Sequence, residues 1–407
     1  MAISRVAIAG AGIGGLTLAA ALGRRGVDVT VLEREAELKP AGAGLALGPN
    51  AINALRDVGL ADAVTAAGVA IGRSAILDAN GRALGSEIDV AELGRQTGAP
   101  IVALHRARLH DVLLNTVGAI GRASVRTSSR VVRYENRDDR IEITCQGGQH
   151  VEADLLVGAD GLYSAVRTQL VGTDAPLYSG YTSWRGVTPA GSVVAPPRMS
   201  ESWGRGQRFG IVDIGFGEIY WFAVANAPAG GTDVDVKREL LERFARWHAP
   251  IAAVIEATPA ARILRTDISD RAPIDRWHDG RVVLLGDAAH PMTPNLGQGA
   301  GQAIEDAIVL DRCLSEEKTL GAALTRYERQ RVARANGIVL ASRRLGAMAQ
   351  WQDPIAVWFR DSLMRLMPPS LALAQAQKLM VIPSHPAGAA RDTSAGRGDA
   401  RDGDRRP

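Results

Sequence analysis

The sequence is short of cysteine, of net charge and of long apolar runs. Its 407 residues contain only two cysteines, Cys145 and Cys313, without a CxxC pair or a neighbouring histidine cluster. This argues against a disulfide framework and a zinc site, and it fits a reducing, cytoplasmic location. The net charge of +3 at pH 7 is spread along the chain without a basic block, so nucleic acid is not an expected partner. The apolar stretches are interrupted too often by charged and turn residues to predict a membrane span.

The sequence has instead two glycine-rich segments that lie far apart in the chain. They are VAIAGAGIGGLTLAAALGRRGVDVTVLER, residues 6–34, and VVLLGDAAHPMTPNLGQGAGQAIEDA, residues 282–307. Each runs from an apolar strand through a glycine-rich turn into a helix, an arrangement that suits a large phosphate-bearing cofactor. Together they predict one cofactor held at both ends.

The first glycine turn has the GxGxxG pattern, directly after a strand and at the start of a helix. Gly10 permits the tight turn, Gly12 lets the backbone approach a pyrophosphate, and Gly15 allows the helix to pack closely on the strand. Glu33, at the end of the next strand, can accept hydrogen bonds from ribose hydroxyls, whereas Arg34 would suit a 2′-phosphate. The pattern alone does not separate FAD from NAD, and a tight turn without a ligand is the alternative.

The second turn places a carboxylate and a helix N-terminus close together in the sequence. Asp287 leaves a buried strand, where its side chain can bind a ribityl or ribose hydroxyl, and Pro294 stiffens the approach to Gly297 and Gly299. The positive end of the helix that follows is suited to an anionic flavin ring. A plain helix-capping turn with a solvated aspartate is the alternative here.

The rest of the chain alternates between helical and strand patterns. Strands are predicted over 4–9, 27–32, 154–157 and 281–285, a strand pair over 124–136 and 140–146, and an antiparallel sheet over 178–222; helices are predicted over 14–25, 106–117 and 233–257, from Pro49 and Ser164, and over 299–377. The last residues are rich in Gly, Asp and Arg and predict a disordered tail.

Three motifs, in this order, resemble the flavin-dependent aromatic hydroxylases of the para-hydroxybenzoate hydroxylase type. They are GAGIGG with Glu33, GADGLYSAVR and LLGDAAHPMTPNLGQG. The resemblance implies an α/β fold with a Rossmann-like FAD-binding domain on a parallel sheet, an antiparallel substrate domain and C-terminal helices. The expected division is an FAD-binding domain over 1–72, 100–177 and 270–345, a substrate domain over 73–99 and 178–269, a helical segment over 346–384 and a tail over 385–407.

The resemblance also implies roles for single residues. Asp160, Gly161 and Arg167 are expected at the pyrophosphates of FAD and NAD(P)H, and Arg106 and Val131 at FAD. The remaining implied FAD contacts, two beside the isoalloxazine and two in the glycine turns, are Gly44, Leu45, Gly14 and Ala300.

The implied activity is that of a monooxygenase. In such enzymes NAD(P)H reduces FAD, and O2 then forms a C4a-hydroperoxyflavin that hydroxylates or epoxidises a small aromatic or unsaturated ring. Arg208 and Tyr220, with YSGYTSWRG before them, resemble substrate residues of flavin-dependent urate hydroxylases. Those enzymes carry Asp where this chain has Asn295, and an amide cannot act as an anionic base, so uric acid is not the expected substrate.

Two other functions are compatible with the same motifs. One is an FAD-dependent dehydrogenase or reductase without oxygen transfer, and the other is a flavin-binding protein without catalytic activity. The chain is expected to act as a monomer or a homodimer.

Overall fold

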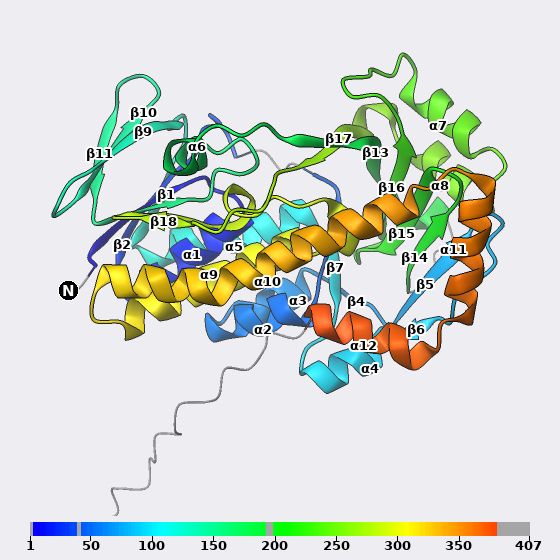
Figure 1. Cartoon of the computed structure of the whole chain (residues 1–407), viewed down its shortest axis with the longest axis horizontal. Helices are drawn as coiled ribbons and strands as arrows, with labels where there is room; N and C mark the ends of the chain where they lie inside the picture. The colour runs from blue at the N-terminus through cyan, green and yellow to red at the C-terminus, as the bar shows by residue number, and fades with distance from the viewer. Residues whose placement is uncertain (1–2, 39–41, 193–197, 381–407) are drawn as a thin grey trace, which may run out of the picture.

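The computed structural model describes residues 3–38, 42–192 and 198–380, which form two lobes joined by a long helix (Figure 1). The expected disordered tail over 385–407 lies outside the described residues. Among the described residues, no helix is long and apolar enough to cross a membrane.

The first lobe is built on a six-stranded sheet of order β18-β19-β12-β1-β2-β8. Its strands are β1 (Arg5–Ala9), β2 (Asp28–Leu32), β8 (Ala123–Arg126), β12 (Leu155–Gly158), β18 (His278–Asp279) and β19 (Val282–Leu284). All pairs are parallel except the one between β18 and β19. The central strands are buried on both faces and therefore read as continuous apolar runs. The predicted parallel sheet is confirmed.

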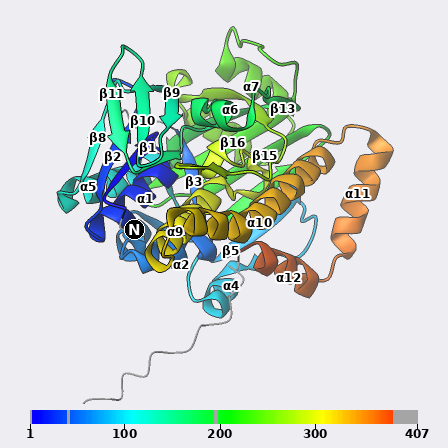
Figure 2. The same cartoon turned by 60° about the vertical axis from the view of Figure 1, so that its left-hand side comes forward.

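Helices cover one face of this sheet and a small antiparallel sheet covers the other (Figures 1 and 2). The helices are α1 (Ile13–Arg24), α5 (Arg106–Ile120) and α9 (Gly299–Glu316), and the small sheet is β9 (Val131–Asn136), β10 (Ile141–Cys145) and β11 (His150–Ala153). Helix α1 is almost fully buried, because its Ala, Gly and Leu side chains let α5 and α9 pack closely around it.

Short elements complete the first lobe and the region between the two lobes. They are a sheet of β3 (Gly44–Leu47), β7 (Val102–His105) and β4 (Gly68–Ala70), with helices α2 (Pro49–Asp57), α3 (Ala61–Ala66), α4 (Val90–Thr97) and α6 (Ala165–Val171). Pro49 and Ser164 stand at the starts of α2 and α6, as predicted.

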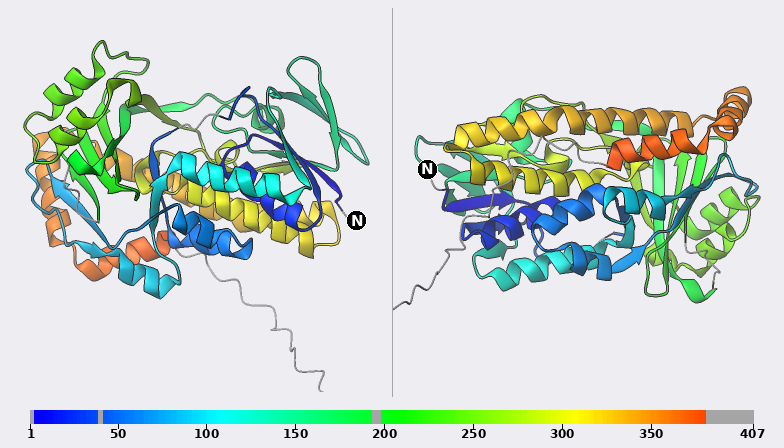
Figure 3. Two further views of the ribbon diagram at one scale, coloured as in Figure 1. Left: turned by 180° about the vertical axis from the view of Figure 1, so that it is seen from behind. Right: turned by 90° about the horizontal axis from the view of Figure 1, so that it is seen from below.

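The second lobe is a seven-stranded sheet of order β17-β13-β16-β15-β14-β5-β6. Its strands are β5 (Arg73–Asp78), β6 (Ile88–Asp89), β13 (Leu177–Pro189), β14 (Arg198–Trp203), β15 (Gln207–Asp213), β16 (Glu218–Asn226) and β17 (Leu264–Asp270). Helices α7 (Val236–Phe244) and α8 (Ile251–Ala257) pack on its outer face. The inner face looks toward the first lobe (Figure 3).

Helix α10 (Leu320–Ala349) links the lobes, and α11 (Pro354–Leu366) and α12 (Pro369–Met380) follow it around the far end (Figure 1). The predicted helical region over 299–377 is therefore four helices, because Thr319 and Asp353 cap new helix starts. The predicted strand over 124–136 is also two strands. Ser128, with φ +51°, breaks it, so that β8 joins the parallel sheet and β9 the small sheet.

Candidate cofactor site

A cavity of about 240 Å³ lies at the carboxyl ends of β1, β2 and β12, and its lining residues lie between positions 9 and 165. The predicted cofactor residues in its lining are Gly10, Gly12, Glu33, Arg34, Arg106, Val131, Asp160 and Gly161. In open parallel sheets ligands bind in such a crevice. The structure thus brings together residues that are up to 151 positions apart in the sequence, from Gly10 to Gly161.

The first turn of this cavity can be formed only with glycine at position 10. Gly10 has φ +103°, and a Cβ atom there would lie 2.4 Å from the carbonyl oxygen of Ala159. Its N–H donates to the carbonyl oxygen of Leu32 at 2.8 Å. The turn therefore brings the ends of β1, β2 and β12 into contact, which leaves the cavity directly above them.

The Glu33 carboxylate stands at the edge of the same turn. One of its oxygens accepts from the N–H of Ala11 at 2.8 Å, and the other accepts from the N–H of Glu35 at 3.0 Å. A carboxylate has about four acceptor positions, so each oxygen keeps one for a ligand hydroxyl. This arrangement agrees with the predicted ribose contact.

Asp160 carries one carboxylate oxygen whose hydrogen-bonding capacity is not used. Its Oδ2 accepts from the N–H of Ala165 at 2.8 Å, whereas its Oδ1 is buried and has no hydrogen-bond partner among the described residues. Burial raises the pKa of Asp160. Buried acceptors are normally satisfied, so this oxygen fits a hydroxyl or N–H of a bound molecule.

The cavity also contains residues that the sequence reasoning did not single out. Arg130 precedes the predicted Val131, and Tyr163 lies within the GADGLYSAVR motif with 70% of its surface exposed. Together with Arg34 and Arg106, Arg130 makes three guanidinium groups around the cavity. This positive charge suits a pyrophosphate.

The second glycine turn lies beyond Arg106. Asp287 is exposed to solvent, but the protein around its carboxyl partly desolvates it and raises its pKa, and the charges of His290 and Arg106 oppose that rise. Helix α9, of 18 residues, begins at Gly299, and no side chain of the described residues caps its first N–H groups. The predicted Pro294, Gly297, Gly299 and Ala300 are all exposed or half-buried at this helix start.

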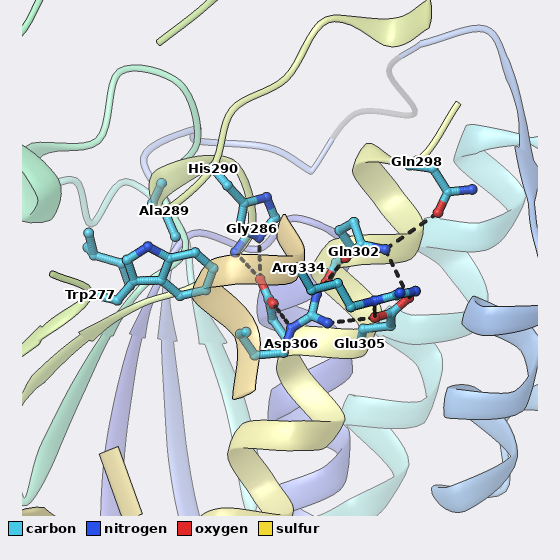
Figure 4. A network of polar contacts seen from close by, with 12 residues as sticks. Trp277, Gly286, Ala289, His290, Gln298, Gln302, Glu305, Asp306 and Arg334 are labelled. Carbon is cyan, nitrogen blue, oxygen red and sulfur yellow. Dashed lines mark hydrogen bonds and ion pairs between the residues drawn. The ribbon is translucent and has the colours of Figure 1, made fainter. Parts of the chain in front are cut away.

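A buried network of charges holds this turn from below (Figure 4). Asp306 accepts from the N–H of Gly286 at 2.9 Å, from Nε2 of His290 at 2.6 Å and from Nε of Arg331 at 2.6 Å. Glu305 accepts from Arg331 and from Asn50 of α2. Burial alone would raise the pKa of Asp306, but the charges of His290 and Arg331 outweigh it and lower this pKa to about 2.

Of the residues predicted in the GAGIGG and GADGLYSAVR motifs, three lie outside the cavity lining: Gly14, Gly15 and Arg167. Gly14 and Gly15 are buried in α1, where Gly14 faces Leu285 and Ala303. Arg167 is fully buried and donates to Asp174 and to the carbonyl oxygens of Ala288 and Ala289. Arg167 therefore stabilises the turn that carries Asp287. Its buried position does not support a direct contact with a pyrophosphate.

Arg208 and Tyr220 lie on the inner face of the second sheet, but they do not touch each other. Arg208 pairs with Val224 and Tyr220 with Val212, so the pair of Gly210 and Phe222 separates them. A Cβ atom on Gly44 would lie 2.4 Å from Cγ of Tyr220, so this ring packs directly on β3 next to Leu45. Burial raises the pKa of Tyr220 to about 12.

The Arg208 guanidinium is held by three side chains. Its Nε donates to Gln350 at 2.9 Å, Nη1 to Glu201 at 3.1 Å and Nη2 to Oδ1 of Asn295 at 2.7 Å. The amide nitrogen of Asn295 donates in turn to the hydroxyl of Tyr181 at 2.9 Å and to the carbonyl oxygen of Ser342 at 3.0 Å. The uncharged side chain of Asn295 therefore uses both its oxygen and its nitrogen in hydrogen bonds, and these bonds connect the two lobes.

The similarity of this chain to known proteins, in sequence and in fold, covers both lobes. Residues 4–342 match the family described as FAD binding domain. The chain is 50% identical over 363 residues to the aurachin C monooxygenase/isomerase of Stigmatella aurantiaca, covering 89% of this chain and 94% of that protein. It is 35% identical over 363 residues to the FAD-dependent urate hydroxylase of Klebsiella pneumoniae, covering 87% and 93%. The crystal structure of Klebsiella pneumoniae HpxO with FAD and uric acid matches with a TM-score of 0.85 and 29% identity, covering 93% of this chain and 96% of that one.

Proposed function

Because the chain belongs to the FAD-binding-domain family of FAD-dependent monooxygenases, we propose that it uses NAD(P)H and O2 to hydroxylate or epoxidise a small aromatic or unsaturated ring. The observation that carries the proposal is the single cavity that joins the GxGxxG turn, Glu33, Arg106 and Asp160. FAD, when bound, supplies the redox chemistry with NAD(P)H and the activation of O2.

The described residues fit FAD in both parts of the site. Glu33 and the Gly10 turn would hold the ribose and pyrophosphate, with Arg106 and Arg130 balancing the negative charge. Asp287 and the uncapped start of α9 would hold the ribityl chain and the pyrimidine side of the ring. We accordingly place the FAD-binding domain at 1–72, 100–177 and 270–345 and the substrate domain at 73–99 and 178–269.

The inner face of the second sheet is our candidate for the substrate-binding surface. Tyr220 packs on β3 and reaches from the substrate lobe to the predicted flavin lobe. With a pKa of about 12, its hydroxyl is neutral at pH 7 and can donate a hydrogen bond to a ring oxygen. Arg208 would act from the other end of the face, where Glu201 and Asn295 fix its guanidinium.

An FAD-dependent dehydrogenase without oxygen transfer is the alternative that the same site permits. The deciding experiment is to purify the protein, record its flavin spectrum, and screen ring compounds for stimulated NAD(P)H oxidation while peroxide and oxygenated product are measured together. We expect stimulation with product in excess of peroxide. Reduction of FAD without oxygenated product from any ring compound would favour the dehydrogenase, and a protein that cannot take up FAD would overturn both.

The cellular location and assembly are part of the same proposal. Both cysteines are buried and unpaired, which suits a reducing cytoplasm. The expected assembly is a monomer or a homodimer, which sedimentation of the purified protein would determine.

A further inference from the structure

Helix α11 lies at the edge of the molecule (Figure 2) and turns its large apolar side chains to solvent. Five of them expose 56 to 80% of their surfaces: Ile355, Trp358, Phe359, Leu363 and Leu366. Their spacing places them on one face of the helix, which we call the α11 face. Arg360, by contrast, is 2% exposed and donates to the carbonyl oxygens of Ala349 and Gly204. A surface helix of a soluble protein normally shows the reverse arrangement, so the α11 face is expected to contact a partner.

The part of the chain that follows α11 does not provide this partner. Helix α12 packs on α4 and β6. Residues 383–407 contain no Leu, Ile, Val, Met, Phe, Tyr or Trp, and burial of such side chains is what would hold a segment on an apolar face. The α11 face is therefore suited to a surface of another molecule.

The area of the α11 face matches what a homodimer needs. With exposed fractions of 56 to 80%, its five side chains present on the order of 500 Å² of apolar surface. A standard interface buries about 800 Å² on each partner, and about 65% of this area is apolar in homodimers. The α11 face alone thus supplies roughly the whole apolar part of such an interface.

The charged side chains of α11 are already paired within the chain. Arg360 pairs with Asp361 at 2.8 Å. Arg365 pairs with Asp78 of β5 at 3.3 Å, and the helix has no other Lys or Arg. An amphipathic helix that binds a membrane surface normally carries many Lys or Arg residues for the anionic headgroups. The α11 face therefore favours an uncharged apolar surface, and the same face of a second copy has that character.

We propose that two copies of the chain form a twofold dimer in which their α11 faces pack on each other. A twofold contact uses the same surface on both copies. With the two helices antiparallel, Ile355 of each copy lies against Leu366 of the other. Phe359 and Leu363, at the middle of the face, lie beside the twofold axis. Such a dimer does not depend on the oxygenase activity proposed above.

The first test is sedimentation velocity of the full-length, FAD-loaded protein at a series of concentrations. We expect the wild-type protein to be a dimer at micromolar concentrations, within the range of standard-sized interfaces. Trp358→Lys and Leu366→Lys each place a charge on the α11 face, and a twofold contact carries each change twice. The dissociation constant of the dimer should therefore rise about a hundredfold or more. Circular dichroism and FAD content should stay unchanged, because both side chains are exposed.

The matched control is Val234→Lys, which changes a residue that is 95% exposed and lies outside α11. This variant should dimerise like the wild-type protein. A second measurement locates the contact: both native cysteines are buried, so Leu363→Cys introduces one accessible thiol beside the proposed axis. Mild oxidation should link two copies of Leu363→Cys covalently, whereas Val234→Cys should stay unlinked.

Three results would overturn the inference. One is a wild-type protein that stays monomeric at about 50 μM, above the range of standard-sized interfaces. Another is a dimer that persists in both Trp358→Lys and Leu366→Lys, because the copies would then meet elsewhere. The third is a wild-type monomer that sediments with phosphatidylcholine vesicles while Trp358→Lys does not, which would make the α11 face a membrane contact.

Discussion

The buried Asp306 network provides a quantitative prediction about the second glycine turn. The pKa of Asp306 falls from 3.8 to about 2 in the folded protein, which corresponds to about 2 kcal/mol of folding free energy at neutral pH. Because the folded-state pKa is the lower one, this contribution is present above about pH 4 and is lost as the pH falls from about 4 toward 2.

The substitution Asp306→Asn should reduce the free energy of unfolding by more than the protonation of Asp306 does. The substitution leaves the guanidinium of Arg331 buried with one carboxylate fewer and weakens the bond from the N–H of Gly286. Breaking a buried ion pair costs about 3 to 5 kcal/mol. With an unfolding entropy of about 0.85 kcal/mol/K for a chain of this length, the melting temperature should fall by about 4 to 6 °C.

The assay is thermal unfolding of the FAD-loaded protein, followed by circular dichroism and by the rise in free-flavin fluorescence. Asp57→Asn is the matched control, because it breaks an exposed ion pair with Arg312 of the same helix α9 and should shift the melting temperature by no more than about 1 °C. Equal melting temperatures for Asp306→Asn and Asp57→Asn would refute the reasoning. So would a difference from wild type that disappears between pH 5 and 7 instead of below pH 4.

Three further predictions concern the predicted flavin and substrate surfaces. Asp287→Ala should weaken FAD retention about tenfold or more, measured by equilibrium dialysis, since the proposed hydrogen bond to the cofactor is lost; unchanged retention would count against the proposed contact. Gly44→Ala places a Cβ atom 2.4 Å from the Tyr220 ring, so product formed per NAD(P)H consumed should fall while FAD content stays normal. Tyr220→Phe removes the neutral hydroxyl from the inner face and should lower the same ratio several-fold; an unchanged ratio would show that Tyr220 only packs against β3.

The sequence indicated which residues would line the cavity of the first lobe, because short-range geometry determines their positions. Position 10 has a positive φ and lies so close to Ala159 that only a residue without a Cβ atom fits there. A sequence shows such a requirement as a glycine at a fixed position after a strand. The same holds for Asp160, which stands two residues after the end of β12 and directly before Gly161. Residues of this kind come together because the carboxyl ends of parallel strands share one edge of the sheet.

The sequence was less informative about side chains whose partners are distant in the chain. Arg167 belongs to a recognisable motif, yet its partners include the backbone of residues 288 and 289, more than a hundred positions away. Arg208 stands between Gln207 and Phe209 in β15, and its contact with Asn295, 87 positions away, depends on which face of the sheet it occupies. Strand pairing determines that face, and the alternation of residues alone does not say which side is turned to the flavin lobe.

The most direct test of the central claim is the origin of the oxygen in the product. The purified FAD-containing protein is supplied with NAD(P)H, isotopically labelled dioxygen and a ring compound that stimulates NAD(P)H oxidation. A monooxygenase should place one labelled atom in each product molecule, with little peroxide released. Product that carries oxygen from water, or NAD(P)H oxidation that yields only peroxide with every ring compound tested, would contradict the account.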